Sequence, residues 1–218
     1  YVGIWTQMPT FSTIGAVARH LLTQSTLREA GTDAFFRSRD LDALGLTFRD
    51  LGRLVKEGAV ERVAKGLYRL RSAEPTEHYT LAAVCARVPQ AIVCLLSALR
   101  VHGIGTQLPR EVWIAIPHKA RAPRMPEFPI RIVRFSGPSL RYGIQRIRLE
   151  GVPARVTSPA RTVVDCFRFR RLVGLAAAQE ALREALRERK ASAEEIWRAA
   201  EVCRARSLVG PYLEALGG

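Results

Sequence analysis

The sequence predicts an α+β protein, in which an N-terminal winged helix-turn-helix precedes a larger α/β domain with a small mixed sheet flanked by helices. Three observations support this fold class. Apolar residues recur at helical spacing up to about residue 57, and two strand-like runs around a glycine follow them. Strand-like and helical stretches then alternate beyond residue 76. We expect residues 13–72 and 76–218 to form the two domains, with residues 1–12 a tail or a foreign remnant.

The first domain is expected to hold three helices. Apolar residues at helical spacing predict one over residues 13–30, and residues 38–45 predict a short second helix that a glycine ends. The third helix begins at Thr47, whose spacing to Asp50 forms a variant of the capping box, and it closes at Gly58. We expect its apolar positions to pack on the first two helices; they are Phe48, Leu51, Leu54 and Val55.

A hairpin is predicted after these helices. Residues 60–63 and 67–70 are strand-like, and Gly66 between them suits the positive φ of a tight turn. Helices followed by a hairpin are the order of a winged helix. At this wing Lys65 lies at the tip between Arg62 and Arg69, within reach of a DNA backbone or minor groove.

The third helix has a cationic face that predicts DNA contact. Arg49, Arg53 and Lys56 recur at i, i+4 and i+7, which suits a helix lying in the major groove. We expect Thr47 and Arg49 to contact bases, and Arg53 and Lys56 to contact phosphates. The alternative is a solvated charged face, in which Arg53 forms an ordinary i, i+4 ion pair with the acid at position 57.

The second domain is the more basic one. The chain carries a net charge of +14, which favours a polyanionic partner. Residues 119–171 hold 13 basic side chains and three acidic ones. Four of the basic residues alternate along predicted strands and are expected to line one side of the sheet or its edges; they are Arg131, Arg134, Arg146 and Arg148. We infer a second nucleic-acid contact here, with an acidic partner protein or a merely solubilising surface as alternatives.

Three segments in this order resemble AbiEi-type antitoxins of type IV toxin–antitoxin systems. Residues 54–70 (LVKEGAVERVAKGLYRL) resemble the winged-helix part of that family. Residues 97–103 (SALRVHG) with 112–117 (VWIAIP), and residues 156–165 (VTSPARTVVD), resemble its C-terminal domain.

The resemblance implies a repressor of its own operon that binds inverted repeats of double-stranded promoter DNA. It also implies an antitoxin that counters a nucleotidyltransferase-type toxin without needing a stable complex with it. Under this resemblance Arg49, Arg53 and Lys65 fall in the operator-reading helix and wing, and the antitoxic activity belongs to the second domain. Arg161 and Asp165 lie four residues apart within the third segment, and we interpret them as a structural ion pair.

We expect no enzymatic activity, cofactor or metal site. The sequence has no Gly-rich phosphate loop, and its four histidines have no partners at catalytic spacing. Its four cysteines lie in apolar surroundings without metal-binding spacing, which favours core positions in a reducing compartment. No apolar run reaches the roughly 18 residues of a membrane span, so we expect no membrane association and a cytoplasmic location. We also expect a monomer or weak dimer.

Two functions of different classes therefore stay open. One is a sequence-specific DNA-binding repressor that is also an antitoxin. The other is a protein-binding adaptor whose basic second domain docks an acidic partner or toxin. An adaptor tolerates the loss of Arg49 and Arg53, whereas a repressor does not.

Overall fold

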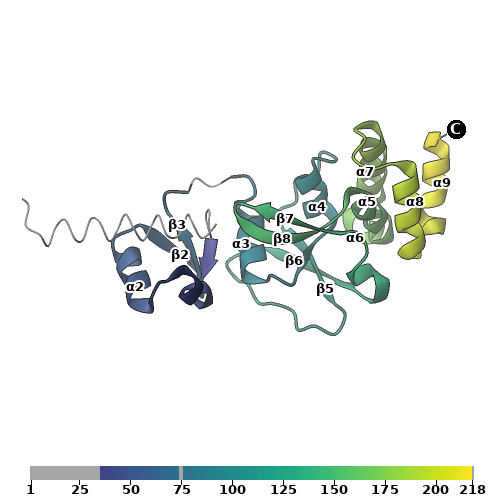
Figure 1. The fold of residues 1–218 in the computed structure, drawn as a ribbon. Coiled ribbons are helices and arrows are strands. Elements are labelled where there is room, and N and C mark those ends of the chain that lie inside the picture. Colours follow the sequence, from purple (N-terminus) through teal and green to yellow (C-terminus); the bar gives the residue numbers. More distant parts are fainter. Residues whose placement is uncertain (1–34, 74–75, 218) are drawn as a thin grey trace, which may run out of the picture. The chain divides into compact units, whose positions relative to one another are not determined.

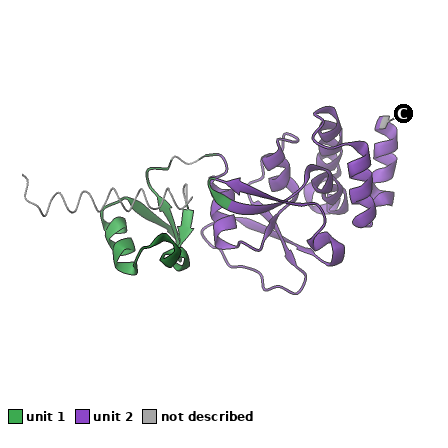
Figure 2. Cartoon of the chain, in the orientation of Figure 1, with its two compact units in different colours: residues 1–76, 150–152 green, residues 77–149, 153–218 purple. Residues whose placement is uncertain are grey.

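The computed structural model describes residues 35–73 and 76–217, and Figure 1 shows its helices and strands. The chain divides into two compact units (Figure 2). The first unit comprises residues 1–76 and 150–152, and the second comprises residues 77–149 and 153–218. Helices and a mixed sheet make the protein α+β, as the sequence predicts. The helix expected over residues 13–30 lies outside the described residues.

The described part of the first unit combines one α-helix with an antiparallel sheet. The strand order is β1-β3-β2. The elements of this unit are β1 (Phe35–Arg37), two 3-10 turns (Ser38–Asp40 and Asp42–Leu44), α2 (Phe48–Lys56), β2 (Val60–Ala64) and β3 (Leu67–Leu70). Buried apolar side chains from every one of these elements except the first turn join in its core, which includes Phe36, Leu41, Leu44, Leu46, Leu51, Leu54, Ala59, Val60 and Leu70.

The hairpin of this unit forms as predicted, whereas its second helix does not. Gly66 has a φ of +71° in the turn between β2 and β3. Over residues 38–45 the chain makes two 3-10 turns in place of the expected helix, and β1 precedes them. The Asp40 carboxylate accepts hydrogen bonds from the backbone N–H of Arg37 at 3.1 Å and from its Nε at 2.8 Å. Such local side-chain bonds offer the backbone an alternative to a regular helix.

The second unit is built on a five-stranded mixed sheet with the order β6-β5-β4-β8-β7. Its strands are β4 (Ile92–Val93), β5 (Val112–Pro117), β6 (Ile130–Phe135), β7 (Ile144–Leu149) and β8 (Val152–Thr157). The pairs β5–β6 and β4–β8 are parallel, and β4–β5 is antiparallel. Strand-like stretches beyond residue 76 do form strands, as the sequence indicated, and β6 and β7 lie at opposite edges of the sheet.

Helices cover the sheet. They are α3 (Tyr79–Arg87), α4 (Leu95–His102), α5 (Pro159–Arg168), α6 (Arg170–Val173), α7 (Leu175–Arg187), α8 (Ala193–Val202) and α9 (Arg206–Gly217), with a 3-10 turn at Gly137–Leu140. Alternate residues Trp113 and Ala115 of β5 point into the main core with α4, α5, α7 and α8. Ile114 is buried on the other face of β5, a strand that α3 also contacts. None of the helices in the described residues is long and apolar enough to span a bilayer.

A buried ion pair fixes α5, which confirms the interpretation of Arg161 and Asp165. Both side chains are fully buried, and Arg161 Nε lies 2.8 Å from Asp165 Oδ2. The remaining Arg161 nitrogens donate to the carbonyls of Tyr142 at 3.0 Å and Ser139 at 3.2 Å. Arg168 pairs with the second carboxylate oxygen at 2.8 Å. Because every charged nitrogen of Arg161 has a partner, this guanidinium is part of the core and not of a binding surface.

The cysteines are core residues, as predicted, and His102 is half-buried against a backbone carbonyl. All four cysteines are free and buried, and burial raises the pKa of the Cys85 thiol to about 12. His102 Nε2 lies 2.6 Å from the Thr157 carbonyl oxygen. Burial lowers the pKa of His102 below its ordinary value of 6.5, so the ring is neutral at physiological pH.

The last helix of the second unit is α9, which follows α8. Gly210 and Pro211 in this helix are residues that usually interrupt helices. Gly210 instead allows a close approach, since a Cβ atom there would lie 3.1 Å from the Trp197 ring of α8. The Arg206 guanidinium also lies 4.9 Å from the centre of that ring.

Candidate nucleic-acid interface

The N-terminus of α2 is fixed by a reciprocal cap. The Asp50 backbone N–H donates to Thr47 Oγ1 at 3.2 Å. The Asp50 carboxylate accepts from the Thr47 backbone N–H at 3.0 Å and from its hydroxyl at 2.7 Å. The hydrogen bond from the Thr47 side chain, with that from its backbone, lowers the pKa of Asp50 below 3.8. The predicted capping box is therefore present, and the Thr47 hydroxyl proton is used within it.

The apolar face of α2 is narrower than the sequence indicated. Leu51 and Leu54 are buried, as expected. Phe48 is 74% exposed and Val55 is 38% exposed, so the prediction that these two residues pack inside is wrong. They lie seven residues apart and thus share a stripe beside the buried arc rather than within it.

The opposite side of α2 carries the predicted cations in two different states. Arg49 and Lys56 are exposed, and neither forms an ion pair with any carboxylate in the described part of the chain. Arg53 forms ion pairs with Asp50 at 3.3 Å and with Glu57 at 3.9 Å. The pair with Glu57 is the i, i+4 pair that the sequence indicated. Arg49 and Lys56 are therefore the cations of this helix that are available to a phosphate or a base.

The hairpin keeps two of its three candidate residues on the surface. Arg62 and Lys65 are exposed, with Lys65 in the turn beside Gly66. Arg69, predicted to flank the wing as a DNA contact, is only 4% exposed. Its guanidinium lies 3.4 Å from Glu61 Oε1 and donates to the Ala73 carbonyl. The expectation for Arg69 is wrong, because these bonds turn its charge inward along the sheet.

The four strand arginines of the second unit do not share one surface. Arg131 and Arg134 lie on β6, whereas Arg146 and Arg148 lie on β7 at the opposite edge of the sheet. The sequence left open whether these arginines line one side of the sheet or its edges, and the structure places them on the edge strands.

The β6 arginines are engaged with neighbouring groups. Arg131 forms an ion pair with Glu111 at 3.2 Å, and its guanidinium lies 5.0 Å from the centre of the Trp113 ring. Arg134 Nη1 donates to three carbonyl oxygens, those of Pro117 at 3.2 Å, His118 at 2.6 Å and Ala120 at 2.9 Å. Both side chains thus organise the protein's own surface, although each remains partly exposed to solvent.

The β7 arginines remain candidates for nucleic-acid contact. Arg146 and Arg148 are exposed and lie two residues apart, so they project from the same face of the strand.

The sequence reasoning missed a second group of cations. Arg87, Arg121 and Arg124 line a pocket of about 410 Å³ in the second unit. Two of them lie in the segment after β5, whose alternation of Arg, Ala and Pro was the available signal. Their placement beside Arg87 along one pocket depends on the tertiary structure, which spacing along the chain does not show.

Two comparisons with known proteins bear on this geometry. Residues 27–71 match the family model described as a transcriptional regulator, AbiEi antitoxin. This match supports the resemblance to AbiEi-type antitoxins that the sequence indicated for the first unit. The matched AbiEi segment contains α2, the hairpin and all the first-unit candidate residues, but it ends before the second unit. No curated protein matches the chain.

The fold has a relative among solved structures. A crystal structure of the RV2827C protein from Mycobacterium tuberculosis aligns with a TM-score of 0.50 at 15% identity. The alignment covers 83% of this chain and 70% of that one. This likeness concerns the fold alone. The resemblance of residues 97–103, 112–117 and 156–165 to the C-terminal domain of AbiEi antitoxins stays a prediction, because these residues lie outside the matched AbiEi segment.

Proposed function

We propose that this protein is a sequence-specific DNA-binding repressor of its own operon and the antitoxin of a type IV pair, acting without enzymatic activity. The observation that carries the proposal is that Arg49 and Lys56 are exposed on a capped helix inside the matched AbiEi segment and form no ion pair with a carboxylate among the residues that the structure describes. The first unit is a winged helix-turn-helix in this proposal, with α2 as the recognition helix and the β2–β3 hairpin as the wing.

The geometry of the α2 N-terminus supports a proposal for which residues contact bases and which contact phosphates. Residues at the start of a recognition helix lie nearest the base edges, and later residues face phosphates. Arg49 is therefore the base-contacting cation, and Lys56 contacts the backbone. Phe48 joins Arg49 at the exposed start of the helix, where an aromatic ring suits contact with a thymine methyl group. Lys65 and Arg62 extend the phosphate contacts from the hairpin.

A titration with DNA tests the repressor. Labelled duplex from immediately upstream of the protein's own gene is compared with a scrambled duplex, at two salt concentrations. We expect preferential binding that the Arg49→Ala/Lys56→Ala variant loses. Arg198→Ala is the matched control, because Arg198 lies on α8 and pairs with Glu194 at 2.8 Å. Equal binding of both duplexes by the wild-type protein contradicts the repressor and favours the adaptor.

The antitoxin function is tested separately in cells. The protein is produced together with a nucleotidyltransferase encoded beside its gene, and growth is measured. We expect rescue of growth by the wild-type protein and by Arg49→Ala/Lys56→Ala alike, because the proposal places the antitoxic activity in the second unit. Rescue that is lost together with DNA binding would contradict this division of labour.

A further inference from the structure

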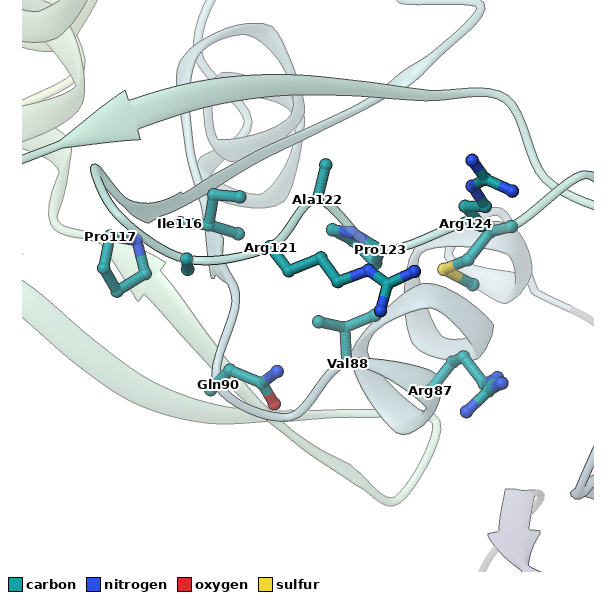
Figure 3. A pocket seen from close by; sticks show the side chains of 11 residues that line it. Arg87, Val88, Gln90, Ile116, Pro117, Arg121, Ala122, Pro123 and Arg124 are labelled. Atoms are coloured by element: carbon teal, nitrogen blue, oxygen red, sulfur yellow. The ribbon is translucent and has the colours of Figure 1, made fainter.

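The pocket beside β5 has a lining that is both cationic and apolar. It lies where three segments of the second unit meet: the end of α3, the residues before β4, and the segment after β5. Figure 3 shows Arg121 extended across the middle of this pocket, with Val88 on one side and Pro123 on the other. Apolar side chains form the walls, among them Ile116, Pro117 and Met125.

The charge of the pocket is entirely positive. Arg87, Arg121 and Arg124 line it, and none of its eleven lining residues is acidic. Within the described ranges of the chain, none of these three arginines forms an ion pair with a carboxylate. Three like charges that line one pocket repel one another, so an anion in the pocket relieves that repulsion.

Two further arginines hold the walls in place. Arg134 of β6 binds the carbonyl oxygens of Pro117, His118 and Ala120, which orders the turn that leads to Arg121. Arg155 of β8 donates to the carbonyl of Gln90 at 3.0 Å and so fixes the opposite wall. The pocket is therefore organised before any ligand arrives, which reduces the entropy that binding costs.

We propose that this pocket binds a nucleoside phosphate. Guanidinium groups form bidentate hydrogen bonds with phosphate oxygens, so a phosphorylated group suits three arginines better than isolated carboxylates do. An inorganic anion alone would leave the apolar walls uncovered, whereas a nucleobase covers them. The volume of about 410 Å³ falls within the range of pockets that take small organic ligands, about 300–1,000 Å³.

The ligand has two possible sources with the same chemistry. It is either a free nucleotide or the phosphorylated end of a single RNA strand. The site does not depend on DNA binding by α2, since all its lining residues belong to the second unit. The failure of one proposal therefore leaves the other standing.

Calorimetric titration of the full chain tests the proposal. The probes are the four ribonucleoside triphosphates, the unphosphorylated nucleosides, inorganic triphosphate and a short 5′-phosphorylated single-stranded RNA. We expect at least one nucleotide to bind more tightly than either its nucleoside or inorganic triphosphate. If the RNA binds more tightly than every free nucleotide, the source is a strand end; if not, it is the free nucleotide.

Charge-matched variants locate the binding. Arg121→Ala and Arg124→Ala should each weaken it about tenfold, the effect of one charge-assisted hydrogen bond. Arg121→Lys keeps the charge but loses the planar fork, and an intermediate loss is expected. Arg198→Ala and Arg49→Ala/Lys56→Ala should bind as the wild type does. Thermal unfolding of each variant checks that the fold is retained, since the substituted side chains are exposed.

Three results would overturn the proposal. The first is no binding of any nucleotide or of the RNA at millimolar concentration. The second is inorganic triphosphate binding as tightly as the best nucleotide, because the apolar walls then contribute nothing. The third is nucleotide binding that Arg121→Ala and Arg124→Ala leave unchanged in folded protein, because the ligand then lies elsewhere.

Discussion

Helix α2 and the sheet of the second unit differ in how they use their basic side chains. In α2, Arg49 and Lys56 are exposed and have no carboxylate partner within the described residues. In the second unit, Arg131 pairs with Glu111, Arg134 binds three carbonyls, and Arg161 is fully buried against Asp165. The more basic unit therefore commits part of its positive charge to its own fold. Net charge indicates the class of partner, but the partners of each side chain decide where contact occurs.

The strongest test of this contrast removes the buried arginine. Arg161→Ala leaves Asp165 buried with only Arg168 as an ionic partner, and it deprives two carbonyls of their donor. We expect the free energy of unfolding to fall by about 3–5 kcal/mol. Urea denaturation measures the loss. Arg49→Ala, on the exposed face of α2, should change the free energy of unfolding by less than about 0.5 kcal/mol. A loss as large as that of Arg161→Ala would contradict the view that Arg49 does not stabilise the fold.

The salt dependence of DNA binding sharpens the same contrast. Each phosphate contact that is lost should reduce the slope of log K against log salt by about 0.9. Lys56→Ala is expected to show that change, because Lys56 is exposed without an ion-pair partner in the described residues. Arg131→Ala is expected to leave the slope unchanged, because Glu111 already neutralises this charge at the edge of the sheet. Anisotropy titrations over a range of salt give both slopes. Equal slopes for the two variants would contradict the prediction that Lys56 contacts a phosphate and Arg131 does not.

A smaller effect separates base reading from phosphate contact. Phe48 is 74% exposed beside Arg49, and its proposed partner is a thymine methyl group. Replacing thymine by uracil removes that methyl group and should weaken wild-type binding roughly fourfold, the value of one buried methylene. The Phe48→Ala variant should bind both duplexes alike. If it still distinguishes thymine from uracil, another residue reads the methyl group.

The sequence predicted much of the fold because caps, turn glycines and strand alternation are signals that lie within a few residues of one another. Helix α2 follows from its Thr47 cap and the hairpin from Gly66, and the strands of the second unit follow from alternation. The short helix over residues 38–45 was wrong because side-chain bonding from Asp40 to Arg37 replaced it. Strand β1 was missed because three residues are too short for a period to show.

The candidate site was less predictable than the fold, because burial and pairing depend on tertiary contacts. Arg69 and Lys65 are both basic residues near the hairpin turn, yet Arg69 is buried and Lys65 is exposed. The sequence shows that two such residues are basic but not which one has a partner. The same holds for Arg87 and Arg121, which lie 34 positions apart in the chain and line one pocket.

The smallest expected effect concerns the cap of α2. Hydrogen bonds from Thr47 lower the pKa of Asp50 below its ordinary value of 3.8, so the ionised carboxylate stabilises the folded form. This contribution is complete above the ordinary value and is lost as the pH falls through the folded pKa. Amide exchange at Asp50 and Leu51, followed by NMR on the full chain in acid, should show the first turn of α2 opening over that range. Asn in the Asp50→Asn variant still accepts a hydrogen bond but does not titrate, so its amides should exchange without this pH step. An identical step in both proteins would mean that another acidic group controls the start of the helix.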